Sequence, residues 1–432
     1  MRIAQLRRHS FAVRYLTLFG GEIFSKLCVM AAFSYMAHML PPSEYGMVEL
    51  ALSVTMFFVM GVEGGMGLYG ARIIAAHHER IPALVPQVMV LRAIIAAPAF
   101  ALMLLAGARY RAEGFGLLWI TAFAVWFTPL LTQWVFQGLR QMQWVAAGTA
   151  LRNLTFAAMI FMLIRPGADI RQVGYAEISG VAALALFNSV VLFGRLRVRL
   201  DLRGVVHGTR QVFRDAWFMG LGDFAWACLW YSPALVLGWL GLYGAEEVAW
   251  IAAPVRVVVA LHTFVFLYFF NLLPNLAVEL TRGVDAWRAV IVRSMRVSTW
   301  PAILLAAAGA ITAPITVPLV FGDSYVSAVL PFQIVIWAIP VAWFSGHFRF
   351  SLIAAGHQRR DFGVSVATAI VTAISAAMFG SKWGSVGSAV ALLTGAIANA
   401  LLAVVVSHKT LGTVPIGAAL IPDVRTWLNW RR

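Results

Sequence analysis

The stretch RLRVRLDLRGVVHGTRQVFRD, residues 195–215, is the longest polar segment of a chain that is otherwise dominated by apolar runs. Six arginines fall within it, and it divides the 432 residues close to their midpoint. A basic segment between two apolar halves is typical of a cytoplasmic linker in a membrane protein. It is either a plain charged loop or a segment that rests on anionic lipid head groups.

The amino-acid composition excludes a soluble protein and favours a membrane protein. Hydrophobic residues make up 61% of the chain, charged residues make up 12%, and the mean hydropathy is +0.82. So little polar surface cannot cover a core in water. The net charge of +15 does not indicate a nucleic-acid partner, because most basic residues lie in short loops between apolar segments.

Hydropathy and turn signals on both sides of the linker predict about twelve membrane-spanning helices, six in each half. The predicted spans are 12–39, 45–70, 84–108, 115–137, 143–165, 172–195, 216–241, 246–275, 290–320, 326–354, 361–380 and 385–408. We therefore expect an all-α membrane protein with two pseudo-symmetric lobes. Its parts are an N-terminal lobe (1–198), a basic linker (199–215), a C-terminal lobe (216–410) and a tail (411–432).

The basic residues also predict the orientation of the chain. Of the 33 lysines and arginines, 23 fall in segments on one side of the predicted bundle. The loops on the other side hold Arg109, Arg111, Arg165, Arg171 and Lys382. Because cytoplasmic loops carry the excess of positive charge, we expect a bacterial inner-membrane protein with both termini in the cytoplasm. The apolar segment from Phe11 to about Leu40 is too long for a cleaved signal and is interpreted as the first span.

Several ionisable residues fall inside the predicted spans, where a charge costs about 2.5–3.5 kcal/mol at a helix centre. They are Glu22, Lys26, Glu63, Arg92, Arg152, Glu177, Asp223, Arg256 and Arg349. Lipid exposure is therefore disfavoured, and we expect these side chains to face a central cavity or one another.

The embedded cations are candidates for a substrate cavity. The set comprises Lys26, Arg92, Arg152, Arg256 and Arg349. A cationic cavity suits an anionic substrate such as a phosphate-linked lipid, to which arginine offers bidentate contacts. Structural roles stay open, because Glu22 and Lys26 are spaced to pair on one helix face. Arg92 and Arg152 lie within a few turns of the cytoplasmic side and can snorkel, whereas the other three cations lie deeper.

Three embedded acids, Glu22, Glu63 and Asp223, are candidates for ion or proton coupling. A buried carboxylate can carry a proton during transport. The alternative for each is a hydrogen bond that packs two helices together. Gly61, Gly64, Gly65, Gly67 and Gly70 crowd the end of the second span, where they allow close helix contact or a flexible bend.

Short motifs along nearly the whole chain resemble one family of transporters. They are Leu40-Pro41-Pro42-Ser43-Glu44-Tyr45-Gly46, Glu63-Gly64-Gly65-Met66-Gly67-Leu68 with Arg72, Trp134-Val135-Phe136-Gln137-Gly138-Leu139-Arg140, Leu237-Gly238-Trp239 through Arg256 with Leu273-Pro274, Phe321-Gly322-Asp323-Ser324-Tyr325, and Ala354-Ala355-Gly356-His357-Gln358. In this order they resemble the Wzx-like O-antigen transporters, which are polysaccharide-export flippases of the multidrug/oligosaccharidyl-lipid/polysaccharide (MOP) superfamily.

The resemblance implies two six-helix lobes around a cationic cavity, and no cofactor. It also implies alternating access that moves an undecaprenyl-diphosphate-linked oligosaccharide outward, with polysaccharide polymerase and glycosyltransferases as partners. Glu63 stands where that family more often has aspartate. The outer loops are short, and nothing in them identifies the sugar.

Two other interpretations stay open. A multidrug exporter of the same superfamily is the nearer one, although such exporters favour acidic cavities for cationic drugs. The other is a membrane O-acyltransferase or polymerase, in which His262 or His347 would serve as a base. No metal-ligand or nucleophile–base spacing appears in the sequence, so transport is the preferred interpretation.

Overall fold

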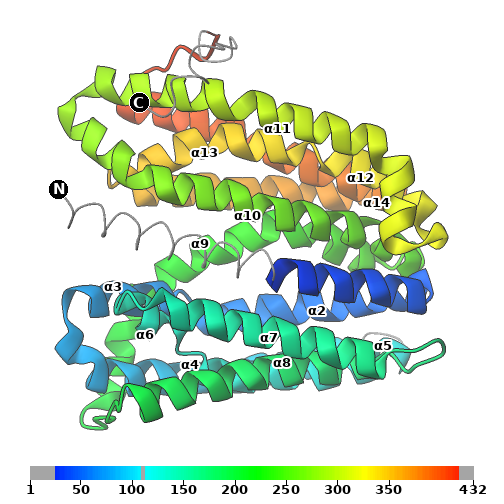
Figure 1. Cartoon of the computed structure of the whole chain (residues 1–432), viewed down its shortest axis with the longest axis horizontal. Helices are drawn as coiled ribbons and strands as arrows, with labels where there is room; N and C mark the ends of the chain where they lie inside the picture. Colours follow the sequence, from blue (N-terminus) through cyan, green and yellow to red (C-terminus); the bar gives the residue numbers. More distant parts are fainter. Residues whose placement is uncertain (1–24, 109–111, 418–432) are drawn as a thin grey trace, which may run out of the picture. The chain divides into compact units, whose positions relative to one another are not determined.

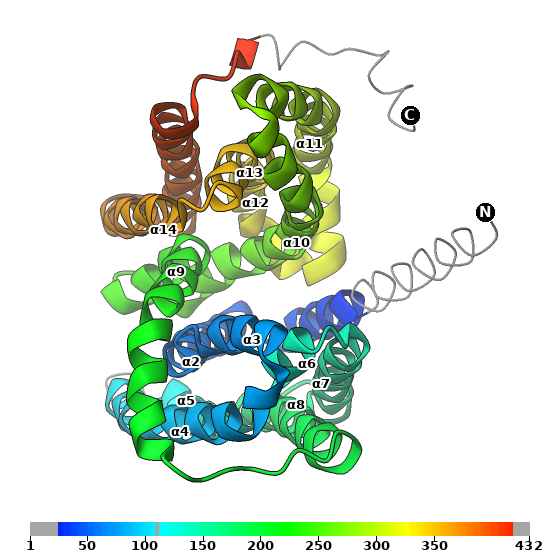
Figure 2. The same ribbon diagram turned by 90° about the vertical axis from the view of Figure 1, so that its left-hand side faces the viewer.

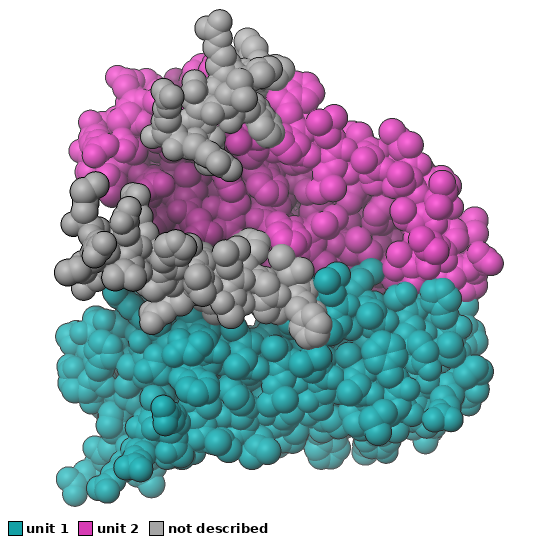
Figure 3. Space-filling view, in the orientation of Figure 1, with its two compact units in different colours: residues 1–224 teal, residues 225–432 magenta. Residues whose placement is uncertain are grey.

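The computed structural model describes residues 25–108 and 112–417, and the described residues are helical throughout, with no strand among them. The chain divides into two compact units, residues 1–224 and 225–432 (Figure 3). The boundary falls inside helix α9 (Val205–Leu240). Because α9 begins at Val205, the basic segment 199–215 is partly helical rather than a loop throughout.

Unit 1 consists of the helical stretches that precede α9 and the beginning of α9 itself (Figure 1). A helix whose described part is 25–39 comes first, before the labelled elements. The labelled elements are α2 (Pro42–Glu63), α3 (Met66–Ala76), η1 (His78–Arg80), α4 (Ile81–Gly107), α5 (Ala112–Ala122), η2 (Phe123–Leu130), α6 (Gln133–Gly138), α7 (Met142–Leu163), α8 (Arg171–Ser189) and η3 (Val190–Arg195). Helices α7 and α8 lie side by side in both views (Figures 1 and 2).

Unit 2 contains the rest of α9 and five further helices. They are α10 (Ala245–Arg282), α11 (Val284–Phe321), α12 (Val329–Val335), which follows the short η4 (Asp323–Ala328), α13 (Ala338–Ala354) and α14 (Gln358–Leu411). Helix α14 is two helices in one, because Trp383 and Gly384 have non-helical backbone angles. Its two arms pack against each other and against α13 (Figure 2).

The helices have the length and the surface of membrane spans. Within the described residues, nine helical segments are long and apolar enough to cross a bilayer. That number counts α14 once and does not include α9 or the helix at 25–39, so it is consistent with twelve spans, and the exact count stays a prediction. On α11, Ile311, Ile315 and Leu319 form an exposed apolar stripe at a spacing of four residues, as expected of a face in contact with lipid.

Two predicted spans of the N-terminal half are broken rather than continuous. The span predicted at 45–70 is α2 and α3, separated by Gly64 and Gly65, which both have positive φ. The span predicted at 115–137 is a sequence of three short pieces, α5, η2 and α6. Such breaks free backbone groups inside the membrane region, and those groups need partners there.

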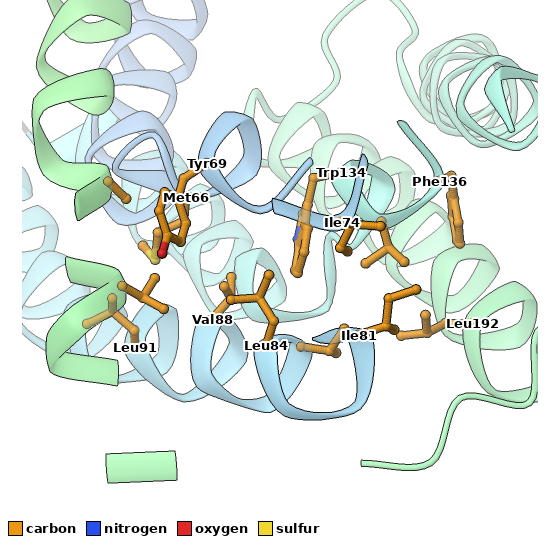
Figure 4. Packing of buried hydrophobic residues seen from close by; sticks show 14 of the residues in the cluster. Met66, Tyr69, Ile74, Ile81, Leu84, Val88, Leu91, Trp134, Phe136 and Leu192 are labelled. Carbon is orange, nitrogen blue, oxygen red and sulfur yellow. The ribbon is translucent and has the colours of Figure 1, made fainter. Parts of the chain in front are cut away.

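The core of unit 1 shows why the glycine-rich end of the second span is needed. Trp134 of α6 is buried beside Ile74 of α3 and Leu84 of α4 (Figure 4). A Cβ atom at Gly70 would lie 2.4 Å from the Trp134 ring, so Gly70 makes the space that the indole occupies. Close packing of large on small residues is how membrane helices gain contact area.

Candidate functional site: charges inside the membrane-spanning helices

Three of the embedded arginines are paired with carboxylates in the structure. Arg92 contacts Glu63, Arg152 contacts Glu177, and Arg349 contacts Asp361. Glu22 and the tail from residue 418 onward lie outside the described residues. The pairs differ in burial and in neighbours, and these differences decide which charges can meet a substrate.

The Arg92–Glu63 pair lies at the break between α2 and α3. Arg92 Nη2 is 3.4 Å from Glu63 Oε1, and the Arg92 side chain is only 1% exposed, whereas that of Glu63 is 50% exposed. Gly67 leaves the space for this pair, because a Cβ there would lie 2.6 Å from Glu63 Oε1. The acid is therefore accessible, and the arginine behind it is not.

Arg92 also holds the broken span in place. Its Nη1 donates to the backbone carbonyls of Thr128, at 3.3 Å, and Leu131, at 2.8 Å. Thr128 is in the last turn of η2 and Leu131 lies between η2 and α6, where the regular helical hydrogen bonds are interrupted. A buried guanidinium satisfies carbonyls that water cannot reach, so Arg92 has a structural role and does not snorkel.

A glycine crossing brings α9 onto the same break. A Cβ at Gly65 would lie 2.3 Å from the Gly220 backbone nitrogen, and a Cβ at Gly220 would lie 2.3 Å from the Gly64 carbonyl carbon. The two backbones therefore touch without intervening side chains. Asp223, one turn beyond Gly220, has an exposed side chain and interacts electrostatically with Glu63. Two accessible carboxylates thus share one crossing with a single buried arginine.

The second network of unit 1 joins three helices. Arg152 Nη2 donates to Glu177 Oε1 at 2.5 Å, and Arg152 Nη1 donates to Asn153 Oδ1 at 3.3 Å. Asn153 Nδ2 in turn donates to Ser25 Oγ at 2.6 Å. The chain of polar contacts therefore runs from α8 through α7 to the helix at 25–39.

Lys26 lies next to this network in the sequence, and its side chain is exposed. Arg152 is near the middle of the 22-residue helix α7, about 15 Å of helix from either end. Arg152 is about one-third exposed and Glu177 is mostly buried. The Arg152–Glu177 pair is thus held near mid-helix depth, and the exposed Lys26 is next in sequence to Ser25 on the helix that the network reaches.

In unit 2, Arg349 is held at the α13–α14 connection. Its Nε and Nη2 donate to the two carboxylate oxygens of Asp361 at 2.6 and 2.9 Å, and Nη2 also donates to Ser365 Oγ at 2.6 Å. Arg349 is five residues from the end of α13, and Asp361 is in the first turn of α14. This bidentate pair joins two consecutive helices, a structural role. Arg256 is half-buried on α10.

The two histidines that were candidates for a catalytic base have structural surroundings. His347 is fully buried, with Nδ1 against the carbonyl of Trp343 at 2.9 Å and Nε2 against Ser294 Oγ at 2.9 Å. Ser294 Oγ is also hydrogen-bonded to Tyr268 OH, at 2.6 Å. No carboxylate orients the imidazole in these contacts, as a hydrolytic triad requires. His262 packs against the ring of Trp230 at 4.9 Å.

Sequence reasoning found the charges but not their partners. Among the described residues no cluster of His, Cys, Asp or Glu could hold a metal ion. Gly220 and Asn153 were missed, because their roles depend on helices more than 100 residues away. The Arg349–Asp361 pair could have been predicted from the sequence, because its members are only twelve residues apart, on two helices joined by one turn.

Comparisons with known proteins agree with this architecture. The family model described as "Polysaccharide biosynthesis protein" matches residues 15–278, more than half of the chain. The Escherichia coli (strain K12) protein named "Putative O-antigen transporter" is 21% identical over 246 residues, which are 54% of this chain and 56% of that protein. The alignment thus spans little more than half the length of this curated relative.

Solved structures of the MOP superfamily have the same fold. An inward-facing multidrug resistance MATE family transporter matches with a TM-score of 0.75 at 12% identity, covering 89% of this chain and 94% of its own. The lipid II flippase MurJ in an inward closed conformation matches with a TM-score of 0.74 at 13% identity, covering 96% and 91%. A MOP superfamily transporter from Pyrococcus furiosus matches with a TM-score of 0.63 at 12% identity, covering 90% and 95%.

The fold is the one seen in these solved structures of a MATE family transporter and a lipid II flippase. The family model covers more than half of the chain. On this evidence the chain belongs to the polysaccharide biosynthesis protein family.

Proposed function

We propose that this protein flips an undecaprenyl-diphosphate-linked oligosaccharide, such as an O-antigen or exopolysaccharide repeat unit, outward across the bacterial inner membrane by alternating access. The observation that carries the proposal is the network around Arg152, with Lys26 beside it. It holds a partly exposed arginine near mid-helix depth, bonded to Glu177 and Asn153. The family match and the O-antigen transporter relative supply the substrate class.

A diphosphate needs such a site because its charge has to cross a medium that does not solvate it. A cation held at that depth is itself costly, at about 2.5–3.5 kcal/mol on the insertion scale. Hydrogen bonds from the Arg152 guanidinium to Asn153 Oδ1 and Glu177 Oε1 limit this cost by fixing the side chain in place. The exposed Lys26 and the partly exposed Arg152 can then meet phosphate oxygens as they arrive.

The acids at the glycine crossing are the proposed coupling site. Glu63 and Asp223 are both exposed, and with Arg92 they carry one net negative charge. Two nearby carboxylates bind a proton or a small cation more readily than either does alone. Release of that ion would drive a rearrangement at the break between α2 and α3, which packs directly on α9.

We also propose that both termini lie in the cytoplasm and that the enzymes of oligosaccharide synthesis and polymerisation are partners. Glycosyltransferases would supply the lipid-linked substrate on the inner face, and a polysaccharide polymerase would consume it on the outer face. The excess of basic residues on the predicted inner side supports this orientation.

Complementation of a deletion strain tests the proposal. Loss of the protein should trap lipid-linked oligosaccharide where an impermeant glycosidase outside the inner membrane cannot cut it. Lys26→Ala should lower the accessible fraction roughly tenfold or more, because a hydrogen bond to a charged group is worth about 1.5–3 kcal/mol. Lys26→Arg should keep most of the transport.

Leu27→Ala is the matched control, because Leu27 is an exposed neighbour without charge. Immunoblots of membrane fractions must show equal amounts of every variant. Full accessibility of the oligosaccharide in a strain that lacks the protein would contradict the flippase function itself. Full accessibility with Lys26→Ala combined with Arg152→Gln would contradict only the role given to this network.

A multidrug exporter is the second candidate, favoured by the accessible pair Glu63 and Asp223, which suits a cationic drug as well as a proton. Exporters of that kind raise the resistance of a sensitive host to cationic compounds. An unchanged inhibitory concentration for such compounds upon expression, together with restored oligosaccharide export, would exclude this alternative.

A further inference from the structure

A groove of ≈ 440 Å³ lies between the two arms of α14, in unit 2. Its volume is within the range of about 300–1,000 Å³ that is usual for small-molecule sites. The residues that line it come from both arms: Arg360, Gly363, Val364, Ala367, Leu402, Val406, Lys409 and Thr410. None of them belongs to the charged networks described above.

The groove exists because the arms are tight at one end and apart at the other. Near the kink at Trp383 and Gly384, a Cβ at Gly387 would lie 1.9 Å from the Phe379 carbonyl oxygen. About two turns further on, a Cβ at Gly395 would lie 2.0 Å from Thr372 Oγ1. Toward the ends of α14 the small residues no longer face each other. At Gly363 an added Cβ would have no neighbour within 4 Å.

The groove has an apolar floor and a cationic mouth. Gly363, Val364, Ala367, Leu402 and Val406 form the floor. At the mouth, two exposed cations, Arg360 and Lys409, and the half-buried hydroxyl of Thr410 lie within a turn of the ends of α14.

The Arg360 side chain is fixed at this mouth, because its Nη1 donates to Thr410 Oγ1 on the opposite arm. The neighbouring carboxylate of Asp361 points elsewhere, since both of its oxygens accept from Arg349. The local charge is therefore positive, and no acid in these contacts cancels it.

The same two arms present exposed apolar side chains next to the groove. Ile370 and Ile374 continue the line of Gly363 and Ala367 along the first arm at helical spacing, whereas Leu401 and Val405 flank the lining residues of the second arm. From Gly363 to Ile374 the helix rises about 16 Å, about half of the ~30 Å hydrocarbon thickness of a bilayer. That is the depth of one leaflet, so a single acyl chain would follow the groove and its continuation.

We propose that this groove binds an anionic glycerophospholipid, with the phosphate on Arg360 and Lys409 and one acyl chain along the cleft between the arms. Cations exposed to water hold a free anion weakly, whereas burial of a chain in the cleft adds the hydrophobic part of the binding energy. The site lies at the end predicted to be cytoplasmic, where the leaflet is rich in anionic lipid. This inference goes beyond the proposed transport function and does not depend on it.

The test uses the purified full-length protein in a neutral detergent. Phosphatidylglycerol is titrated against phosphatidylcholine with identical acyl chains, and lipid retention is read by native mass spectrometry together with the thermal unfolding midpoint. We expect phosphatidylglycerol to be retained and to raise the midpoint well above the effect of phosphatidylcholine. The variant Arg360→Ala/Lys409→Ala should bind it roughly thirtyfold more weakly.

Two further variants separate the chain site from the head-group site. Gly363→Phe fills the cleft from an open position and should abolish retention while both cations remain. Gly194→Phe, at another helical glycine with nothing within 4 Å, should leave retention unchanged. Arg359→Ala removes a neighbouring exposed cation outside the groove and should likewise have little effect. Thermal unfolding midpoints measured without added lipid show whether each variant is folded. The single variant Lys409→Ala removes one cation of the mouth while the Arg360–Thr410 contact stays intact.

Equal retention of phosphatidylcholine would overturn the proposal, as would undiminished preference for phosphatidylglycerol in the double variant. Soluble glycerol 3-phosphate supplies the last arm of the test. If it displaces phosphatidylglycerol at equal concentration, the mouth is a site for a free anion and the lipid proposal is wrong. Oligosaccharide export is not a readout here, so a failure of this proposal leaves the proposed flippase function untouched.

Discussion

Arg92 and Glu63 are partners with opposite surroundings, and this contrast defines what each contributes. Arg92 is almost fully buried and donates to two carbonyls of a broken span, whereas half of the Glu63 side chain is exposed. A buried cation with fixed acceptors holds structure, and an exposed acid at a helix break is available for chemistry. The sequence shows both charges inside spans but cannot show which one is accessible.

Arg92→Ala and Glu63→Gln should therefore have different consequences. Arg92→Ala removes the donor to the Leu131 carbonyl and one of the two donors to the Thr128 carbonyl, which also accepts from the Leu131 N–H. An unsatisfied carbonyl costs about 1–3 kcal/mol, so both the membrane abundance and the thermal midpoint should fall. Glu63→Gln keeps a polar side chain beside Arg92, so abundance should stay near the parent's while the dependence of transport on the proton gradient changes. Immunoblotting and gradient-dependent transport measurements separate the two effects. Equal loss of abundance in both variants would contradict this division of roles.

At the scale of the helices, the glycines of residues 61–70 are not equivalent. Gly70 accommodates the Trp134 ring of α6, and Gly65 is in backbone contact with α9 at Gly220. Gly61, by contrast, has no atom within 4 Å of an added Cβ. Sequence inspection predicts close helix contact for the whole run, whereas the structure assigns a different neighbour to each position.

Gly70→Ala should destabilise unit 1 by about 1–3 kcal/mol through overpacking against the Trp134 indole. Gly61→Ala is the control and should be neutral or slightly stabilising, because alanine favours the helix and has open space. Combining Gly70→Ala with Trp134→Leu should recover part of the loss, since the smaller side chain makes room. Thermal unfolding of the purified variants provides the measurement, and a midpoint equally low in both single variants would argue against the packing explanation.

The sequence predicts the helices well and their interruptions poorly. Long apolar runs place the spans, because the bilayer demands about 20 apolar residues whatever the tertiary contacts are. The kink at Trp383 and Gly384 falls in the gap predicted between the spans 361–380 and 385–408. The break at Gly64 and Gly65, by contrast, lies inside the predicted span 45–70, because it depends on what packs beside it and not on the hydropathy of the run. The same limit applies to the site, where Arg152 was found from its position but its bond to Asn153, which reaches on to Ser25, was not.

At the scale of the whole chain, the number of spans and the orientation are linked, because each span moves the chain to the opposite face of the membrane. Helix α9 and the helix at 25–39 are not among the nine candidate spans, and α14 holds two arms within one of them. If α9, the helix at 25–39 and both arms of α14 cross the bilayer as predicted, the chain crosses an even number of times. The loops then alternate strictly between the two faces.

Cysteine accessibility decides this directly. After replacement of Cys28 and Cys228 by alanine, single cysteines at the exposed positions Arg165 and Lys382 should react with an impermeant thiol reagent in cells whose outer membrane is permeable. Cysteines at Arg203 and Arg359, also exposed, should react only after the inner membrane is opened.

Four predicted spans separate Arg203 from Arg359, so these two positions must share a face if each of the four helices crosses. Reaction of one and protection of the other would mean an odd number of crossings between them, and twelve spans would be wrong. Reaction of both from outside, with protection at Arg165 and Lys382, would keep the even count but invert the orientation. The mouth of the α14 groove at Arg360 would then lie in the outer leaflet, away from the side on which basic residues and anionic lipids normally meet.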